Sequence, residues 1–238
     1  MPHALQDLIQ DLATCHRQGS RLDADAWTDT VRDEADAYAV QDGVAAALGW
    51  AATRWKSGGA GPGGPFSHSP VSPTVGTEWL GIEAEVALRL ARDVTPDEAA
   101  GPLGSGLIDA MCIAVECVAS RWQQGLAAPA LLRMADLQSN AGLLLGPWRP
   151  WQGLDWAQLG WRLALEGQPD VERRGGHSLA DPAGVLPAWL RHATRHGATV
   201  RAGTVVTTGA WGGLHASPGP LCGELTIDGL GTLQFRAD

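Results

Sequence analysis

Lysine is almost missing from this chain of 238 residues: among its 17 basic residues only Lys56 is a lysine, and the others are arginines. Arginine stays charged at physiological pH, whereas burial can tune the pKa of a lysine, so a single retained lysine is a candidate for proton chemistry. Chance survival is the competing explanation. Basic residues are also outnumbered, and the formal net charge is −9. A basic face for phosphates is therefore not expected, which argues against nucleic acids and membranes as partners.

Long apolar runs are missing as well, although 45% of the residues are hydrophobic. No uncharged apolar stretch reaches the roughly 18 residues that a membrane-spanning helix needs. Residues 1–7 lack the basic and apolar segments of a signal peptide. The four cysteines are scattered without a CxxC pair, which is typical of buried thiols in a reducing compartment. We expect a cytoplasmic protein of one or two domains.

Helical spacing of apolar residues marks the N-terminal part. It predicts one helix over residues 4–16 and a second from about residue 29 to residue 48. A glycine-rich segment, residues 57–65, follows and is either a linker or an active-site lid. Residues 1–75 are therefore interpreted as a helical N-terminal region with a glycine-rich loop.

From residue 76 the pattern changes to that of strands. Alternation predicts a strand over residues 82–88, and a continuous apolar run predicts a buried strand over 111–118. Further expected elements are a short helix at 129–137, a hairpin at 159–173, a helix at 181–196, a strand at 200–207 and a hairpin at 224–235. Residues 76–238 are predicted to form a β-rich catalytic domain, and the fold class is α+β.

Two glutamates on the first predicted strand share a face. Glu83 and Glu85 are two positions apart, so their carboxylates point the same way and lie about 6.5–7 Å apart along the strand. Such a pair is also common on a solvent-exposed face. The pair becomes informative only when a third acidic residue joins it.

Glu116 interrupts the apolar run at residues 111–118. Burying an unpaired carboxylate costs several kcal/mol, so we expect Glu116 to have a cation or a hydrogen-bond network beside it. Lys56, Arg121 and a metal ion are the candidates. Three carboxylates without a histidine or cysteine cluster would make an oxygen-only site, which suits Mg²⁺ or Mn²⁺ rather than Zn²⁺.

Several common catalytic and nucleotide-binding motifs are absent. The sequence has no HExxH, no P-loop, no GxGxxG and no GxSxG. His192 and His196 are four residues apart, but the helix that carries them is expected to turn them outward. The 11 tryptophans are expected in the core, with a tryptophan-lined ligand pocket as the minority interpretation.

Taken in order, short segments along almost the whole chain resemble one family. The chain resembles the 2-oxopent-4-enoate (2-hydroxypenta-2,4-dienoate) hydratases and 4-oxalocrotonate decarboxylases of the fumarylacetoacetate hydrolase-like superfamily. The segments that carry the resemblance are Ala37-Tyr38-Ala39-Val40-Gln41, Trp55-Lys56-Ser57-Gly58, Gly81-Ile82-Glu83-Ala84-Glu85-Val86-Ala87, Val115-Glu116, Ser120-Arg121, Ala135-Asp136, Asp181-Pro182, Trp189-Leu190, Arg201-Ala202-Gly203 and Thr207-Thr208-Gly209-Ala210.

This resemblance implies a fold, a site and an activity. It implies a mixed β-roll of the fumarylacetoacetate hydrolase C-terminal type behind a helical N-terminal region, assembled as a homo-oligomer. Mg²⁺ or Mn²⁺ would bind to Glu83, Glu85 and Glu116. Lys56 would lie beside the ion, either as a proton shuttle at the enol carbon or as an electrostatic partner. The activity would be hydration of 2-hydroxy-2,4-dienoates, small acids of aromatic-compound catabolism. The residues matched to substrate binding are Arg121, Asp136, Thr208 and Gly209.

The sequence departs from the family pattern at three positions where an acid or an amide is usual. His68, Ala119 and Leu137 stand there instead. His68 is either a replacement general base or an ordinary loop histidine. Activity is thereby left open between the hydratase, a decarboxylase of 2-oxo-3-enedioates using Arg54 or Arg121 for the second carboxylate, and an acylpyruvate C–C hydrolase. A catalytically impaired homologue or partner subunit is the alternative outside enzymes.

Overall fold

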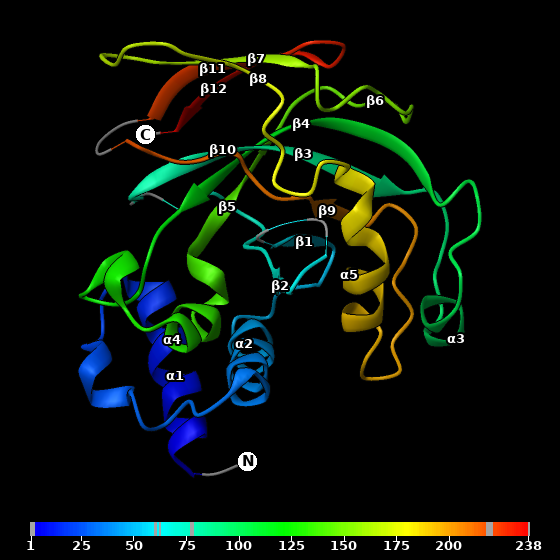
Figure 1. Ribbon diagram of the computed structural model, residues 1–238. Helices are drawn as coiled ribbons and strands as arrows, with labels where there is room; N and C mark the ends of the chain where they lie inside the picture. Colours follow the sequence, from blue (N-terminus) through cyan, green and yellow to red (C-terminus); the bar gives the residue numbers. More distant parts are fainter. Residues whose placement is uncertain (1–2, 60, 62, 77–78, 218–220, 238) are drawn as a thin grey trace.

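The computed structural model describes residues 3–59, 61, 63–76, 79–217 and 221–237. Helices α1 (His3–Gln18), α2 (Glu34–Ala47) and α4 (Ala130–Ala135) form a group on one side of the sheets (Figure 1). Their apolar faces share one core cluster, which includes Leu8, Leu12, Val40 and Leu132. The two N-terminal helices predicted from spacing are confirmed. The second begins only at Glu34, because the side chain of Asp33 caps its first turn.

The strands form two sheets. The larger sheet has the order β2 (Phe66–Pro70), β1 (Arg54–Gly59), β9 (Val205–Thr207), β3 (Gly81–Leu90), β4 (Ile108–Val118) and β5 (Asn140–Leu145), with β10 (Trp211–Ala216) paired to β3 and β6 (Arg149–Pro150) paired to β4. The smaller sheet has the order β12 (Gly231–Ala237), β11 (Leu221–Ile227), β7 (Gly160–Leu165) and β8 (Val171–Arg174). Both predicted hairpins lie in this smaller sheet.

The main core lies between the two sheets, which are stacked in Figure 1. Ile82, Val86 and Leu88 of β3 pack in one cluster with Leu163 and Leu225 of the smaller sheet. Because side chains alternate along a strand, the odd-numbered residues of β3 face the opposite side of the larger sheet. That side carries the glutamates predicted to hold a metal.

A short helix covers the outer strands of the larger sheet. The predicted helix at 181–196 is a 3-10 turn, Pro182–Val185, followed by α5 (Leu186–Ala193). The expectation that His192 faces outward is wrong. Its ring packs against the rings of Tyr38, Trp55 and His68, because α5 lies beside β2 and turns this histidine inward.

The predicted fold class is confirmed: a curled mixed sheet forms a half-barrel behind N-terminal helices. The expected glycine-rich loop is shorter than predicted, since residues 57–59 belong to β1. Strands β1 and β2 precede the predicted boundary at residue 75 yet pair in the same sheet as β3, and that boundary stays a prediction. Short helix α3 (Pro96–Ala100) was not predicted. Among the described residues, no helix combines the length and apolarity needed to cross a membrane.

Candidate metal centre and substrate cavity

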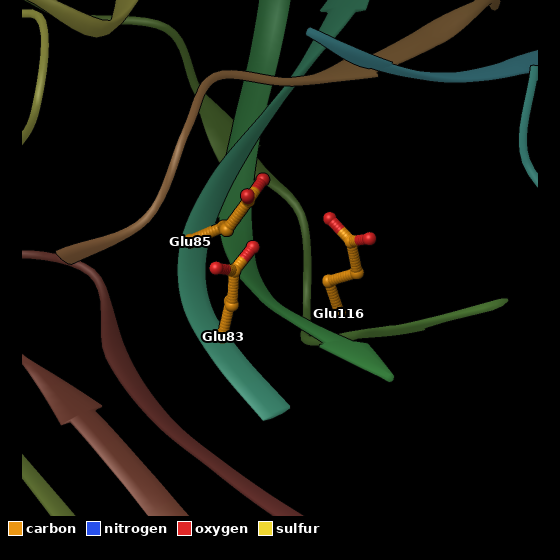
Figure 2. A group of neighbouring side chains, drawn as sticks. All are labelled: Glu83, Glu85 and Glu116. Carbon is orange, nitrogen blue, oxygen red and sulfur yellow. The ribbon is translucent and has the colours of Figure 1, made fainter. Parts of the chain in front are cut away.

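Three glutamates converge on the side of the larger sheet that faces away from the main core. Glu83 and Glu85 project from β3, and Glu116 projects from β4 (Figure 2). Glu83 and Glu116 are direct partners across the antiparallel pair β3–β4. One carboxylate oxygen from each glutamate lies within 4.8 Å of the others. The strand alternation thus brings together the three carboxylates that the sequence singled out.

Two of these carboxylates are deeply buried. Glu85 is 2% exposed and Glu116 is fully buried. Burial, which disfavours the charged form, raises the pKa of Glu116 to about 7, and burial together with the charges of Glu116 and Glu83 raises the pKa of Glu85 well above its ordinary value. One oxygen of Glu85 and one of Glu116 have no hydrogen-bond partner among the described residues. The described residues therefore supply fewer hydrogen-bond donors than these carboxylate oxygens can accept.

Lys56 is the cation in contact with the cluster. Its Nζ forms an ion pair with Glu116 and donates a hydrogen bond to the carbonyl oxygen of Gln138 at 3.3 Å. Burial disfavours the ammonium, but attraction to Glu116, Glu83 and Glu85 outweighs it and raises the pKa of Lys56. Lys56 is therefore an ammonium at neutral pH, and it lines the cavities next to the cluster.

A divalent cation fits this donor set. When all three carboxyl groups are ionised, the one ammonium leaves two negative charges uncompensated in a buried place, and this is why the pKa values of Glu85 and Glu116 are raised. The unpartnered oxygens of Glu85 and Glu116 are hard donors of the kind that Mg²⁺ and Mn²⁺ prefer. A dication would balance the charge and satisfy those oxygens together.

A strained turn shapes the same place. Leu137, Gln138 and Ser139 all have left-handed backbone conformations, with φ values of 49°, 53° and 59°. Each such residue costs about 1–2 kcal/mol when it is not glycine. The side chain of Asn140 holds the turn by donating to the carbonyl oxygen of Leu137 at 2.7 Å. Strain of this kind is concentrated at functional sites, and here it places Gln138 beside Lys56.

Two cavities adjoin the cluster, and Lys56, Glu83 and Gln138 line both of them. The first cavity, of about 490 Å³, also contains Glu85, Ser178 and a series of glycines, namely Gly58, Gly59, Gly176, Gly209, Gly212 and Gly213. A Cβ at Gly209 would approach Ser178 Oγ to 2.6 Å, so glycine keeps this space open. The predicted substrate residue Gly209 does line a cavity beside the carboxylates.

The other predicted substrate residues lie elsewhere. Thr208 is fully buried, and its hydroxyl donates to the carbonyl oxygen of Val86 at 3.0 Å, which ties its segment to β3. Arg121 Nε donates to Asp136 Oδ1 at 2.6 Å, and both residues are buried as a pair. Arg121 lines a separate cavity with residues of the N-terminal helical region, not a cavity that contains Lys56.

His68 is not brought to the carboxylates either. It is the cross-strand partner of Ser57, and Ser57 Oγ lies 2.6 Å from His68 Nδ1. Since Lys56 and Ser57 are consecutive on β1, their side chains leave opposite faces of the sheet. Burial and the nearby arginines lower the pKa of His68 to about 4. Its surroundings are those of a packed core histidine near His192.

Several residues that line the two cavities were not predicted from the sequence, Gln138 and Arg133 among them. Gln138 contacts Lys56 through its carbonyl oxygen, and Arg133 of α4 lines the second cavity. The only sequence signal for Gln138 was its position next to Leu137, where the family pattern fails. Arg133 has helical spacing like any surface arginine, and the sequence held no signal for it.

With this geometry established, the chain can be placed in a family. Residues 52–237 match the family described as fumarylacetoacetate (FAA) hydrolase, C-terminal, and the chain belongs to this family. No curated protein sequence matches it. Solved structures with a similar fold include a decarboxylase and an isomerase.

The structure of 4-oxalocrotonate decarboxylase from Pseudomonas putida G7 complexed with magnesium and adipate gives a TM-score of 0.76 at 17% identity, over 98% of this chain and 97% of that one. The same enzyme complexed with calcium and acetate gives 0.74 at 18% identity, over the same shares of the two chains. For 2-hydroxyhepta-2,4-diene-1,7-dioate isomerase from Mycobacterium marinum the TM-score is 0.51 at 18% identity, over 76% and 72%. At these identities the likeness shows the fold, and the predicted hydratase branch stays a prediction.

Proposed function

We propose that this chain is a divalent-metal-dependent lyase that acts on small 2-oxo or 2-hydroxydienoic acids. The observation that carries the proposal is the meeting of three glutamates and one lysine beside two cavities. Glu83, Glu85 and Glu116 would hold Mg²⁺ or Mn²⁺. When bound, such an ion would supply a Lewis acid for the carboxylate and the 2-oxygen of the substrate.

Lys56 is the proposed proton carrier. Its pKa is raised by the surrounding carboxylates, so the resting group is an ammonium that can give a proton to the dienol carbon. Glu116 holds the Nζ in place through their ion pair. Protonation at C5, with release of the 2-hydroxyl proton to solvent, gives the conjugated 2-oxo-3-enoic acid. Addition of water, with OH going to C4 and H to C3, completes the hydration.

Decarboxylation of a 2-oxo-3-enedioate is the second candidate reaction. It is supported by the likeness to 4-oxalocrotonate decarboxylase, which extends over nearly the whole of both chains. Loss of CO₂ leaves a dienolate, and Lys56 would protonate it as in the hydration. The two reactions therefore use the same proton carrier and differ in the bond that breaks.

Turnover assays test the proposal. The purified chain is mixed with 2-hydroxypenta-2,4-dienoate or 2-oxohex-3-enedioate, with Mg²⁺, with Mn²⁺ or with a chelator. Loss of dienol absorbance reports hydration, and CO₂ release reports decarboxylation. We expect turnover of at least one acid only when metal is present. Glu85→Gln should abolish it, and Glu166→Gln, at an exposed hairpin position, should not.

Metal binding without turnover of any dienoate, enedioate or acylpyruvate would contradict the proposal. It would favour the catalytically impaired homologue instead. The predicted homo-oligomer and cytoplasmic location are further expectations, which size-exclusion chromatography and cell fractionation would test.

A further inference from the structure

The second cavity beside the carboxylates contains three buried donors without partners. It has a volume of about 360 Å³ and is lined by Lys56 and Glu83 together with residues around the strained turn. Arg133 Nε, Gln138 Nε2 and Ser139 Oγ are all buried, and none has a hydrogen-bond partner in the described part of the chain. Buried donors in folded proteins nearly always have a hydrogen-bond partner, and a buried donor without one is destabilising.

The chemistry of these donors specifies what would satisfy them. A guanidinium, an amide and a hydroxyl match a group with several acceptor oxygens and a negative charge, which describes a carboxylate. The remaining lining of the cavity is largely apolar, with Val118, Leu126, Ala130, Met134 and Leu214. Such a lining suits a short hydrocarbon chain that connects the metal-binding head of a substrate to a second charged group.

The two arginines that the sequence suggested for a second carboxylate are occupied elsewhere. Arg54 donates to the carbonyl oxygen of Pro73 at 3.4 Å, and Arg121 is bonded to Asp136 and to the carbonyl oxygen of Asn140. Neither lines a cavity that contains Lys56 and Glu83. Arg133 does, and its Nε has no hydrogen-bond partner among the described residues.

We infer that Arg133, supported by Gln138 and Ser139, binds a second carboxylate of the substrate, and that the substrate is a dicarboxylic 2-oxo or 2-hydroxydienoic acid. This inference rests on the proposed function, because the metal site must hold the 2-oxo acid head for the cavity to receive the other end. It applies to hydration and to decarboxylation alike. Arg133 is then a specificity-determining residue.

Binding of two matched acids separates this inference from the proposed function. 2-Oxoadipate and 2-oxohexanoate have the same 2-oxo acid head and the same number of carbons, and only the first has a second carboxylate. Their affinities are measured by calorimetry on the full chain with Mg²⁺ and with a chelator. We expect 2-oxoadipate to bind about 10- to 100-fold more tightly, the range of a charge-assisted hydrogen-bonded pair.

Substitution of Arg133 is the second part of the experiment. Arg133→Met should remove the preference for 2-oxoadipate and leave the affinity for 2-oxohexanoate within about threefold. Arg133→Lys keeps the charge and should restore part of the preference. Arg191→Met, on the exposed side of α5, is the matched control and should change neither affinity. Circular dichroism checks that each variant is folded. If Arg133→Met does not fold, Arg133→Lys still tests whether the geometry of the guanidinium is needed for the preference.

Each unfavourable outcome has a distinct meaning. Equal, magnesium-dependent binding of both acids by the unaltered chain would overturn the inference and leave the proposed function standing. Equal weakening of both acids by Arg133→Met would place Arg133 at the head of the substrate and would also overturn it. Failure of both acids to bind in a magnesium-dependent way would remove the proposed function and the inference together.

Discussion

At the scale of single residues, the site is governed by a charge imbalance. Glu116 lies in the buried stretch 110–118 of β4, whose other residues are apolar, and Lys56 from a different strand reaches it. The same lysine competes with any metal ion for that carboxylate. Lys56 thus has two proposed effects, proton transfer to the substrate and competition with the metal ion for Glu116. A substitution of Lys56 should change them in opposite directions.

Replacing Lys56 with Met should lower kcat/KM by about 10²- to 10⁴-fold, the usual contribution of a positioned acid or base. The affinity for Mg²⁺ should not fall, because the substitution removes a competing cation from Glu116. Lys56→Arg, which keeps a cation that cannot release its proton, should remain as inactive as the methionine variant. Calorimetric titration of Mg²⁺ beside steady-state kinetics checks both parts. A loss of metal affinity in the methionine variant would show that Lys56 is structural.

Glu85→Gln should have opposite effects on the metal-free and the metal-loaded protein. Removing one of three crowded, buried carboxylates relieves repulsion, so at pH 8 the metal-free variant should melt about 2–4 °C higher, which corresponds to about 1 kcal/mol for a chain of this size. The rise in melting temperature that saturating Mg²⁺ gives the unaltered chain should vanish. Differential scanning calorimetry measures both. A metal-dependent rise that persists would take Glu85 out of the ligand set.

At the scale of elements, the first cavity depends on the segment between β9 and β10. Gly209 has a φ of 99°, and a Cβ there would meet Ser178 Oγ at 2.6 Å and Gly58 Cα at 3.6 Å. Gly203, just before β9, has a similar φ of 82°, but nothing lies within 4 Å of the position that a Cβ would take there. Comparing alanine substitutions at the two glycines therefore separates the effect of backbone strain from that of filling the cavity.

Gly209→Ala should reduce kcat/KM at least tenfold and destabilise the chain by about 1–3 kcal/mol, because strain and steric overlap act together. Gly203→Ala should cost about 1 kcal/mol from strain alone and leave kcat/KM unchanged. Urea denaturation and kinetics on both variants make the comparison. Equal kinetic effects in the two variants would mean that the Gly209 cavity does not receive substrate.

The same scale shows what the sequence could reveal. β3 was predictable because apolar and acidic residues alternate along it, and β4 because its apolar residues form a nearly continuous run. The same patterns also located the three glutamates. β2, β5 and β10 were missed because serine, glycine and histidine interrupt their apolar patterns. His68 was a candidate general base because of its position in the chain, with an ordinary loop histidine as the alternative. Its face of the sheet depends on the register with Ser57, which only the folded chain reveals.

At the scale of the whole molecule, buried histidines couple folding to pH. His68 and His192 lie where α5 meets β2, with Arg191, Arg195 and His196 among the charged groups nearby. Burial, followed by repulsion from Arg195, lowers the pKa of His68 to about 4 and that of His192 to about 2. Both rings are therefore neutral in the folded chain across a pH range where they are charged in the unfolded chain.

The sign of this effect is set by the depressed pKa values. The stabilisation from a neutral His68 is complete above its unfolded pKa of about 6.5 and is lost as the pH falls towards 4, since only the unfolded chain gains the proton. Between pH 7 and pH 5 the loss should be about 2 kcal/mol from His68 alone. Glu85 and Glu116, with raised pKa values, act in the opposite direction over part of this interval. Comparing variants that share both glutamates cancels their contribution.

His68→Gln should therefore flatten the dependence of unfolding free energy on pH. Urea denaturation at pH 7 and pH 5, in the presence of a chelator, should show a fall that is about 2 kcal/mol smaller in this variant than in the unaltered chain. His3→Gln, at an exposed position on α1, should leave the dependence unchanged. If His68 were instead a solvent-accessible general base, its pKa would lie near 6.5 in both states, and His68→Gln would leave the pH dependence of stability intact while suppressing turnover. The two measurements together assign His68 either to the packing between α5 and β2 or to catalysis.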